Sequence, residues 1–190
     1  MRDEAPPRYA ARLNSFKVGA DAYWPGKNRV TTADLLERAA TVEGLNAADL
    51  NYPDHFENTS PRELAAVLDR LGIGLNGLAM RYYSDTDFRL GALTNPDPVR
   101  RRKAIDLTRR GLDALAEMGG TLMTFWLGQD GFDYPFQADY EQMWDDTIAA
   151  VSELAAHDPA IDIALEYKPD EPRSYSLMPD VGTTLLAIRE

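Results

Sequence analysis

Short apolar runs alternate with longer amphipathic segments along most of the chain. Apolar runs of this length predict buried strands, and apolar positions that recur every three to four residues predict helices packed on one side. Residues 1–13 combine charges with adjacent prolines, so we expect a flexible tail there. The predicted strands are Phe16–Ala20, Leu45–Asn51, Ile73–Met80, Thr121–Leu127 and Ile161–Glu166.

The segments between the predicted strands carry helix signals. Thr32 is expected to cap a helix that runs to Ala40, and Ser60, followed by Pro-Arg-Glu, has the composition of a second helix start. Further helices are expected over 98–118, 140–155 and from about residue 182 to the end of the chain. Strand and helix therefore alternate, which predicts right-handed βαβ units and a parallel sheet. Five such units suit either an open doubly wound sheet or part of an eight-stranded barrel.

Length and charge narrow the possible functions. The chain has 190 residues and a formal net charge of −11, enough for one sizeable core but not for two domains. The acidic balance repels phosphate groups, so neither nucleic acid nor a membrane surface is an expected partner. The chain has no cysteine, no run resembling a membrane span and no nucleotide-binding glycine motif. We therefore expect a cytoplasmic protein with a single domain.

The end of the fifth predicted strand carries the most informative chemistry. With a side-chain period of two, Glu166 and Lys168 share one face, while Leu165 points to the opposite face, where helices would bury it. Ligands gather at the carboxyl ends of parallel strands, so a carboxylate and an ammonium there can share one substrate. The carboxylate suits a hard divalent cation, and the ammonium suits an oxygen that gains negative charge. The spacing alone leaves open an ordinary Glu–Lys pair at a strand end.

Three segments resemble the xylose isomerase-like sugar isomerases and epimerases. Residues 166–173 (Glu-Tyr-Lys-Pro-Asp-Glu-Pro-Arg) are similar to Glu-Pro-Lys-Pro-Asn-Glu-Pro-Arg on the fifth strand of xylose isomerases. Residues 126–131 (Trp-Leu-Gly-Gln-Asp-Gly) are similar to Trp-Gly-Gly-Arg-Glu-Gly after their fourth strand. Residues 94–98 (Thr-Asn-Pro-Asp-Pro) resemble the wider group.

The resemblance implies an α/β fold in which residues 14–190 form an incomplete (β/α)8 TIM barrel of about five βα units. It also implies a divalent metal (Mg²⁺, Mn²⁺ or Co²⁺), with Glu166 as its ligand and, in the related epimerases, as an acid/base. Lys168 matches the lysine that hydrogen-bonds the sugar carbonyl oxygen. Trp126 matches a tryptophan that walls the sugar, although a lone tryptophan on a strand is usually part of the core. The 171–172 bond aligns with a cis peptide of the family.

The end of the second predicted strand departs from this family. Xylose isomerases have Phe-His-Asp-Asp-Asp there, and the histidine assists opening of the sugar ring. In this chain Asn51 stands where that histidine belongs, Asp54 falls near its partner aspartate, and His55 is one step beyond. The resemblance thus makes Asn51 a candidate for substrate binding and makes Asp54 and His55 catalytic candidates. A plain surface position for His55 remains the alternative.

Two other basic features are expected to be structural. His157 lies at a predicted helix end, where it can complement the helix dipole. The run Arg100–Lys103 lies early in a predicted helix, and four consecutive residues spread around a helix rather than converge on a phosphate. We therefore expect a solvated face there.

The length of the chain bears on its activity. A complete barrel of this type takes about 250 residues, so we expect the N-terminal part of a divalent-metal-dependent sugar isomerase that interconverts an open-chain aldose and ketose. The parent protein is expected to be a homo-oligomer, and the 190-residue chain alone is expected to be inactive and to be poorly soluble or oligomeric. The alternatives are a ketose 3-epimerase, an inosose dehydratase-like lyase, and a non-catalytic half-barrel that serves binding or assembly.

Overall fold

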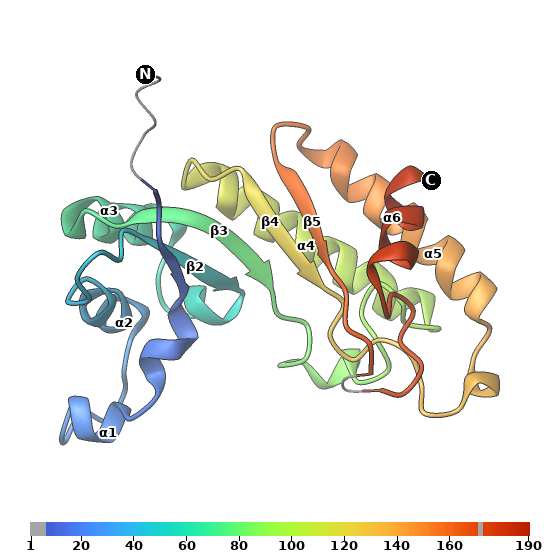
Figure 1. Ribbon diagram of the computed structural model, residues 1–190, viewed down its shortest axis with the longest axis horizontal. Coiled ribbons are helices and arrows are strands. Elements are labelled where there is room, and N and C mark those ends of the chain that lie inside the picture. The colour runs from blue at the N-terminus through green and yellow to red at the C-terminus, as the bar shows by residue number, and fades with distance from the viewer. Residues whose placement is uncertain (1–6, 171–172) are drawn as a thin grey trace.

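The computed structural model describes residues 7–170 and 173–190. Its strands form one sheet in the order β1-β2-β3-β4-β5, and every neighbouring pair is parallel (Figure 1). Strands that follow one another in the chain are therefore neighbours in the sheet, as successive βα units require. The strands are β1 Ala10–Arg12, β2 Ala47–Tyr52, β3 Gly74–Met80, β4 Leu122–Trp126 and β5 Asp162–Glu166.

Helices connect these strands, and one of the two caps expected from the sequence is the observed one. The helices are α1 Ala20–Tyr23, α2 Thr32–Ala39, α3 Pro61–Leu71, α4 Pro98–Glu117, α5 Tyr140–His157 and α6 Val181–Arg189. Ser60 caps α3 in a reciprocal capping box with Glu63, as the sequence predicts. The cap of α2 is Thr31 rather than Thr32, because the Thr31 side chain accepts from the amide of Asp34, whose carboxylate reaches back to Thr31.

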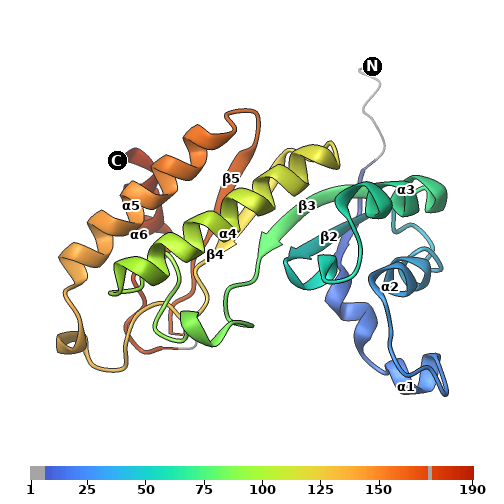
Figure 2. The same cartoon turned by 180° about the vertical axis from the view of Figure 1, so that it is seen from behind.

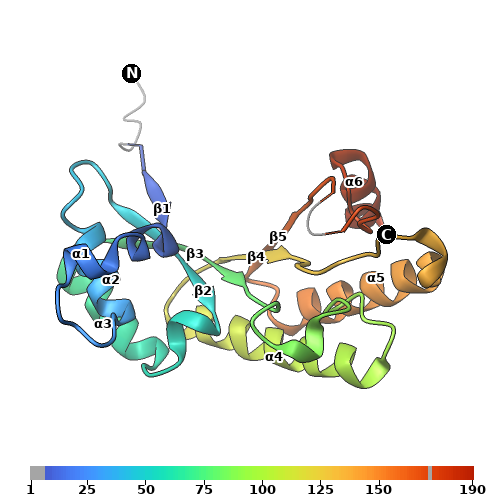
Figure 3. The same cartoon turned by 90° about the horizontal axis from the view of Figure 1, so that it is seen from below.

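The helices cover one face of the sheet, seen from behind in Figure 2. In Figure 3, α3, α4 and α5 run along the outside of the curved sheet, and α6 lies beyond β5, where its residues Ala187 and Ile188 line a pocket with residues of α5 and β5. Side chains of β4 alternate accordingly: Met123 and Phe125 are fully buried beneath the helices, and Trp126 points to the other face. The largest fully buried core side chains are Tyr82, Phe88, Phe125, Leu13, Leu36, Leu50, Leu64, Leu78, Met80, Leu93, Leu112 and Leu115.

The first strand is the main correction to the sequence-based prediction. Residues 10–12 pair with β2, and Leu13 is fully buried, so the expected tail through residue 13 is wrong for residues 10–13. The expected strand at Phe16–Ala20 is also wrong, because Leu13–Lys17 forms a 3-10 helix and α1 begins at Ala20. A three-residue strand of sequence Ala-Ala-Arg carries no β-branched or aromatic residue, so neither β-propensity nor an apolar run signals it.

The expected α/β architecture is confirmed: five parallel strands with helices on one face form part of a TIM barrel. The remaining predicted strands agree with β2 to β5 within two residues at each end. Within the described part of the chain, none of the helices combines the length and apolar character that crossing a bilayer would require.

Candidate functional site

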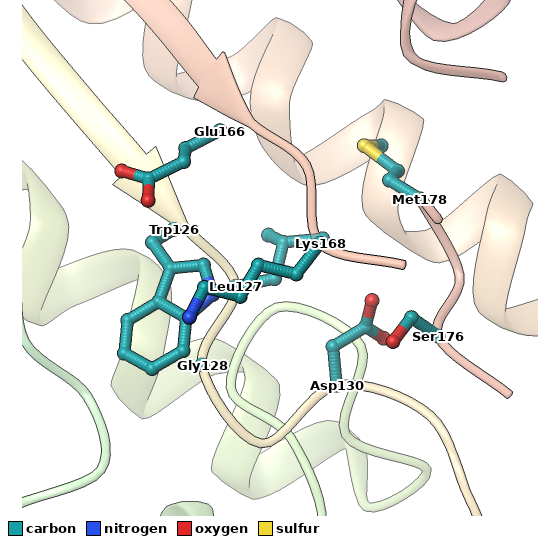
Figure 4. A pocket seen from close by; sticks show the side chains of 8 residues that line it. All are labelled: Trp126, Leu127, Gly128, Asp130, Glu166, Lys168, Ser176 and Met178. Carbon is teal, nitrogen blue, oxygen red and sulfur yellow. The ribbon is translucent and has the colours of Figure 1, made fainter. Parts of the chain in front are cut away.

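The carboxyl ends of β4 and β5 meet at one pocket (Figure 4). Trp126 and Glu166, the last residues of the two strands, are paired in the sheet register, so their side chains share the face away from the helices. Lys168 follows two residues later, and its Nζ lies over the Trp126 ring, 5.0 Å from the centroid. The pocket is lined by Trp126, Leu127, Gly128, Asp130, Glu166, Lys168, Ser176 and Met178.

Glu166 is bound by an arginine from the far side of the sheet. The Arg12 guanidinium donates a hydrogen bond of 2.9 Å to Glu166 Oε2. Arg12 ends β1, and β1 and β5 are the two edge strands, so the sheet curls enough for one side chain to span its concave face. The two side chains remain 48% and 34% exposed. The ion pair therefore orients the carboxylate while contributing little stability.

Aromatic rings extend the site from β4 to the end of β3. The rings of Trp126 and Tyr83 meet edge to face, with centroids 5.5 Å apart. The Arg81 guanidinium lies over the Tyr83 ring, 4.7 Å from its centroid. Together with Lys168 over Trp126, the contacts form a row in which two cations flank two rings. Such a row offers both stacking surface and hydrogen-bond donors to a polyhydroxylated ligand.

His55 is turned into the protein at the end of β2, not into this pocket. It is 6% exposed, Nδ1 accepts from the amide of Asn51 at 2.9 Å, and Nε2 lies 2.9 Å from the side-chain oxygen of Asn14. A carbonyl oxygen can only accept, so Nε2 carries the proton. Burial, with the charges of Arg81 and Lys17, lowers the pKa of His55 to about 4. The ring is therefore neutral at pH 7. Its two hydrogen bonds join the 3-10 helix Leu13–Lys17 to β2, so the geometry indicates a structural role rather than proton transfer.

The other two candidates at the end of β2 also lie outside the pocket lining. Asn51 is 3% exposed and projects to the same face as Glu166, along the row Asn51, Ala79, Thr124 and Ala164 set by the register. Asp54 is half-buried and accepts from the Ser84 hydroxyl at 3.1 Å, beside the end of β3. The structure thus brings Trp126, Glu166 and Lys168 together and leaves Asp54 and His55 at the end of β2, which β3 separates from β4 in the sheet.

A residue that the sequence analysis did not single out, Asp130, lines the pocket floor. Its side chain is buried, and Oδ2 accepts from the amide of Leu177 at 2.9 Å. Burial raises the pKa of Asp130 to about 6, against the lowering effect of the amides of Leu177, Met178 and Gly131 and of the Thr94 hydroxyl. The one sequence signal was an acidic residue between two loop glycines within residues 126–131, which more often marks a solvated turn.

Two loops are fastened together beside Asp130. Phe132 and Tyr175 form an antiparallel bridge through amide–carbonyl hydrogen bonds of 3.3 and 3.0 Å. The Tyr140 hydroxyl donates to the Tyr175 carbonyl at 2.6 Å and accepts from the Phe132 amide at 3.1 Å. This bridge ties the segment after β5 to the segment after β4. It therefore fixes the wall of the pocket that Ser176 and Met178 provide.

Replacing Gly131 with alanine is expected to break this bridge. Gly131 has φ +76°, and an added Cβ would collide with the Tyr175 carbonyl. The change should cost roughly 2 kcal/mol beyond the strain of positive φ, since two hydrogen bonds of about 1 kcal/mol each are lost. Urea denaturation measures the cost, and hydrogen exchange at the Tyr175 amide locates it.

Gly128→Ala is the matched control for this change. Gly128 has φ +74°, but a Cβ there meets no other heavy atom within 4 Å. Both variants therefore carry the strain of positive φ, and only Gly131→Ala carries the collision. Equal urea midpoints for the two variants would contradict the inferred role of the bridge.

His157 and the run Arg100–Lys103, which were expected to be structural, contact acidic side chains of the helices and loops. His157 ends α5 and lies 2.7 Å from an Asp113 carboxylate oxygen. Within the run Arg100–Lys103, Arg101 pairs with Asp146 and the next two residues pair with other acidic groups. The predicted cis bond at 171–172 lies outside the described residues.

The described residues do not by themselves fit a divalent metal. Magnesium and similar cations take about six oxygen ligands. Within residues 7–170 and 173–190, no group of three or more His, Cys, Asp and Glu side chains is placed to hold such an ion. Glu166, the predicted ligand, is instead paired with Arg12. A metal at Glu166 would need oxygen ligands beyond those that this part of the chain supplies.

Known proteins resemble this chain in sequence and in fold. A family model described as xylose isomerase-like TIM barrel matches residues 36–178. Xylose isomerase from Thermus thermophilus is 30% identical over 163 residues, which cover 81% of this chain and 42% of that protein. A structure of D-psicose 3-epimerase with D-tagatose from Clostridium cellulolyticum superposes with a TM-score of 0.71 at 18% identity, covering 96% of this chain and 59% of that one. L-Ribulose 3-epimerase gives 0.68 at 17% identity, with 96% and 56% covered.

Two conclusions follow from these comparisons. The chain spans less than half the length of the xylose isomerase that it matches. The two solved structures are similar in fold, and their chains also extend beyond the matched part. Because the family model covers most of the chain, this protein belongs to the xylose isomerase-like TIM barrel family.

Proposed function

We propose that this chain supplies the first five βα units of a sugar isomerase that interconverts an open-chain aldose and its ketose. The observation that carries the proposal is the convergence of Trp126, Glu166 and Lys168 at the ends of adjacent strands. The similarity to a xylose isomerase supports the same class of reaction. The greater length of that relative supports the proposal that further residues complete the barrel.

Each of the three side chains has a distinct part in the proposed reaction. The indole face of Trp126 packs against the carbon side of the sugar. The Lys168 ammonium donates a hydrogen bond to the carbonyl oxygen and stabilises the negative charge that grows on it. In the proposed reaction Glu166 accepts a proton from the carbon next to the carbonyl and returns it to the former carbonyl carbon, while Arg12 keeps the carboxylate oriented. A divalent cation would add a Lewis acid, but its ligand set is not complete in the described residues.

For Asn51, at the end of β2, we propose a role in substrate binding. It shares the concave face with Glu166, and an amide both donates and accepts hydrogen bonds. Asp54 is proposed as a second polar contact at the rim of the site. For His55 we propose a positioning role only, because its two ring nitrogens are engaged within the protein.

The test compares the 190-residue chain with a longer protein that includes whatever follows Glu190 in the same reading frame. Both are incubated in D2O with Mg²⁺, Mn²⁺ or Co²⁺ and with aldopentoses, ketohexoses and inosose, and the products are identified by NMR. We expect the longer protein to interconvert an aldose and a ketose and the shorter chain to show no turnover. No conversion of any sugar by the longer protein would refute the proposed function.

The products also separate the rival reactions. A ketose epimerised at C3 would identify an epimerase, and loss of water from inosose would identify a lyase; either result refutes the isomerase. Deuterium incorporated at the carbon next to the carbonyl indicates an enediol and a protein base, whereas its absence indicates direct hydrogen transfer between the two carbons. If the reading frame stops after Glu190 and the chain binds sugars without turnover, a binding module is favoured.

A further inference from the structure

Three loops at the carboxyl end of the sheet converge on the carboxyl group of Asp130. Asp130 itself lies between β4 and α5, and Thr94, whose hydroxyl lowers the Asp130 pKa, lies between β3 and α4. Leu177, whose amide donates to Oδ2, lies between β5 and α6. Asp130 is 6% exposed, and a carboxyl group is seldom buried this far without a specific use.

The carboxyl group of Asp130 is only partly satisfied by these contacts. Within residues 7–170 and 173–190, neither Oδ1 nor the Thr94 hydroxyl has a partner that meets full hydrogen-bond geometry, although the Thr94 hydroxyl is close enough to lower the Asp130 pKa. A buried oxygen without a partner costs free energy that the rest of the fold must offset. The cost is retained where the other oxygen does something that an apolar side chain cannot do. Here Oδ2 accepts a hydrogen bond from the Leu177 amide, which an apolar side chain would leave to bind water.

The segment that Asp130 holds is the one that holds Lys168. The amide of Lys168, two residues beyond the end of β5, donates to the carbonyl of Met178 at 3.2 Å. Met178 follows Leu177 directly, so the Asp130 contact and the Lys168 contact lie on adjacent residues of one segment. Figure 4 shows the residues that line the pocket, with Asp130 and Ser176 toward the lower right and Lys168 extending toward Trp126.

We infer that Asp130 is a positioning residue that keeps Lys168 over the Trp126 ring by fixing the backbone of Leu177 and Met178. The importance of this placement for catalysis rests on the proposed function. The position of Lys168 itself does not depend on the proposed function, and it can be measured without a sugar or a turnover assay. A failed activity test would therefore leave this inference standing, and the reverse also holds.

The test uses the NMR signals of ¹³C-dimethylated lysines. The chain has four lysines, Lys17, Lys27, Lys103 and Lys168, and dimethylation preserves their charge. Methyl groups over the face of an indole ring resonate upfield, so the Lys168 signal should be the most strongly shifted; Lys168→Arg assigns it. Lys103, whose Nζ lies 5.4 Å from the Phe88 centroid, provides an internal ring-current reference far from Asp130 in sequence.

Asp130→Ala is expected to abolish most of the upfield shift of Lys168 while leaving that of Lys103 unchanged. Asp130→Asn should retain most of it, because an amide oxygen still accepts from Leu177. Asp133→Ala is the matched control: Asp133 is on the same loop and contacts Ser174 and Arg173, but its side chain is 63% exposed. It should keep the wild-type spectrum.

Several results would overturn the inference. A folded Asp130→Ala variant that keeps the Lys168 shift would do so, and so would a wild-type protein that lacks the shift. If Asp130→Ala does not fold, the wild-type protein still decides the matter through hydrogen exchange at Leu177. A slowly exchanging amide supports the buried bond to Asp130, and exchange at the rate of an open loop refutes it.

Discussion

Replacing Lys168 with methionine is expected to reduce kcat by about 10²–10³ in the protein length that shows isomerase turnover, the usual cost of removing one donor to a developing oxyanion. Methionine keeps most of the side-chain length and the packing against Trp126 but removes the charge. KM should change much less, because the interaction strengthens as charge grows on the carbonyl oxygen. Steady-state kinetics on the sugar identified in the product screen provides the measurement.

Two controls define what this loss means. Lys168→Arg keeps a cation, although its planar guanidinium has a different geometry, so partial activity is expected. Lys103→Met removes a lysine whose ammonium pairs with Asp85 and Asp87 on the outside of the molecule, and its kcat should equal that of the parent. If Lys168→Met and Lys103→Met have the same kcat, then Lys168 is not part of the reaction.

Local sequence signals predicted the elements whose stabilising groups are near one another in the chain. Ser60 and Glu63 lie three residues apart and form the capping box that their spacing indicates. The period-two pattern of the fifth strand likewise places Leu165 toward the core cluster and Glu166 in the pocket. In both cases the decisive contacts are fixed by secondary-structure geometry alone.

Contacts between distant residues were outside the reach of such signals. Arg12 lies 154 positions from Glu166 and falls in a segment that was expected to be a tail. Nothing in the sequence therefore indicated the ion pair that balances the Glu166 charge. His55 similarly meets Asn14 across 41 positions. Alignment with the family placed His55 near the site but could not indicate which way its ring turns.

Asp130 illustrates a further limit. Its neighbours in sequence are those of an exposed turn, and a lone loop carboxylate is usually solvated. Its carboxylate accepts from the amide of Leu177, 47 positions later, and this contact forms only when the segment after β5 folds back. A buried carboxyl in a loop becomes visible only when the tertiary structure is known.

Asp130 and His55 together predict an unusual dependence of stability on pH. The pKa of His55 is lowered from 6.5 to about 4 in the folded protein. As pH falls from 6.5 toward 4, the unfolded chain therefore takes up a proton that the folded protein does not, and stability is lost. The pKa of Asp130 is raised from 3.8 to about 6. Over pH 6 to 4 the folded protein takes up a proton before the unfolded chain does, and stability is gained.

The two contributions have opposite signs and similar sizes, each about 3 kcal/mol at full extent. The wild-type free energy of unfolding should therefore change little between pH 6.5 and 4.5. Removing one group exposes the other: Asp130→Asn should lose about 2 kcal/mol as pH falls over this range, and His55→Gln should gain about as much. Urea denaturation at half-unit pH intervals measures the three slopes.

The range stops at pH 4.5 because other carboxylates dominate below it. The pKa of Asp34 is lowered, against the raising effect of burial, by hydrogen bonds from Lys27 and from its cap Thr31, and that of Glu63 is lowered by hydrogen bonds from its cap Ser60, so their stabilisation is lost in more acidic solution. Asp133→Asn, on the same loop as Asp130 but exposed, should follow the wild-type slope. If Asp130→Asn runs parallel to the wild type instead, Asp130 is ionised throughout the range, and its burial among the three loops is not maintained in solution.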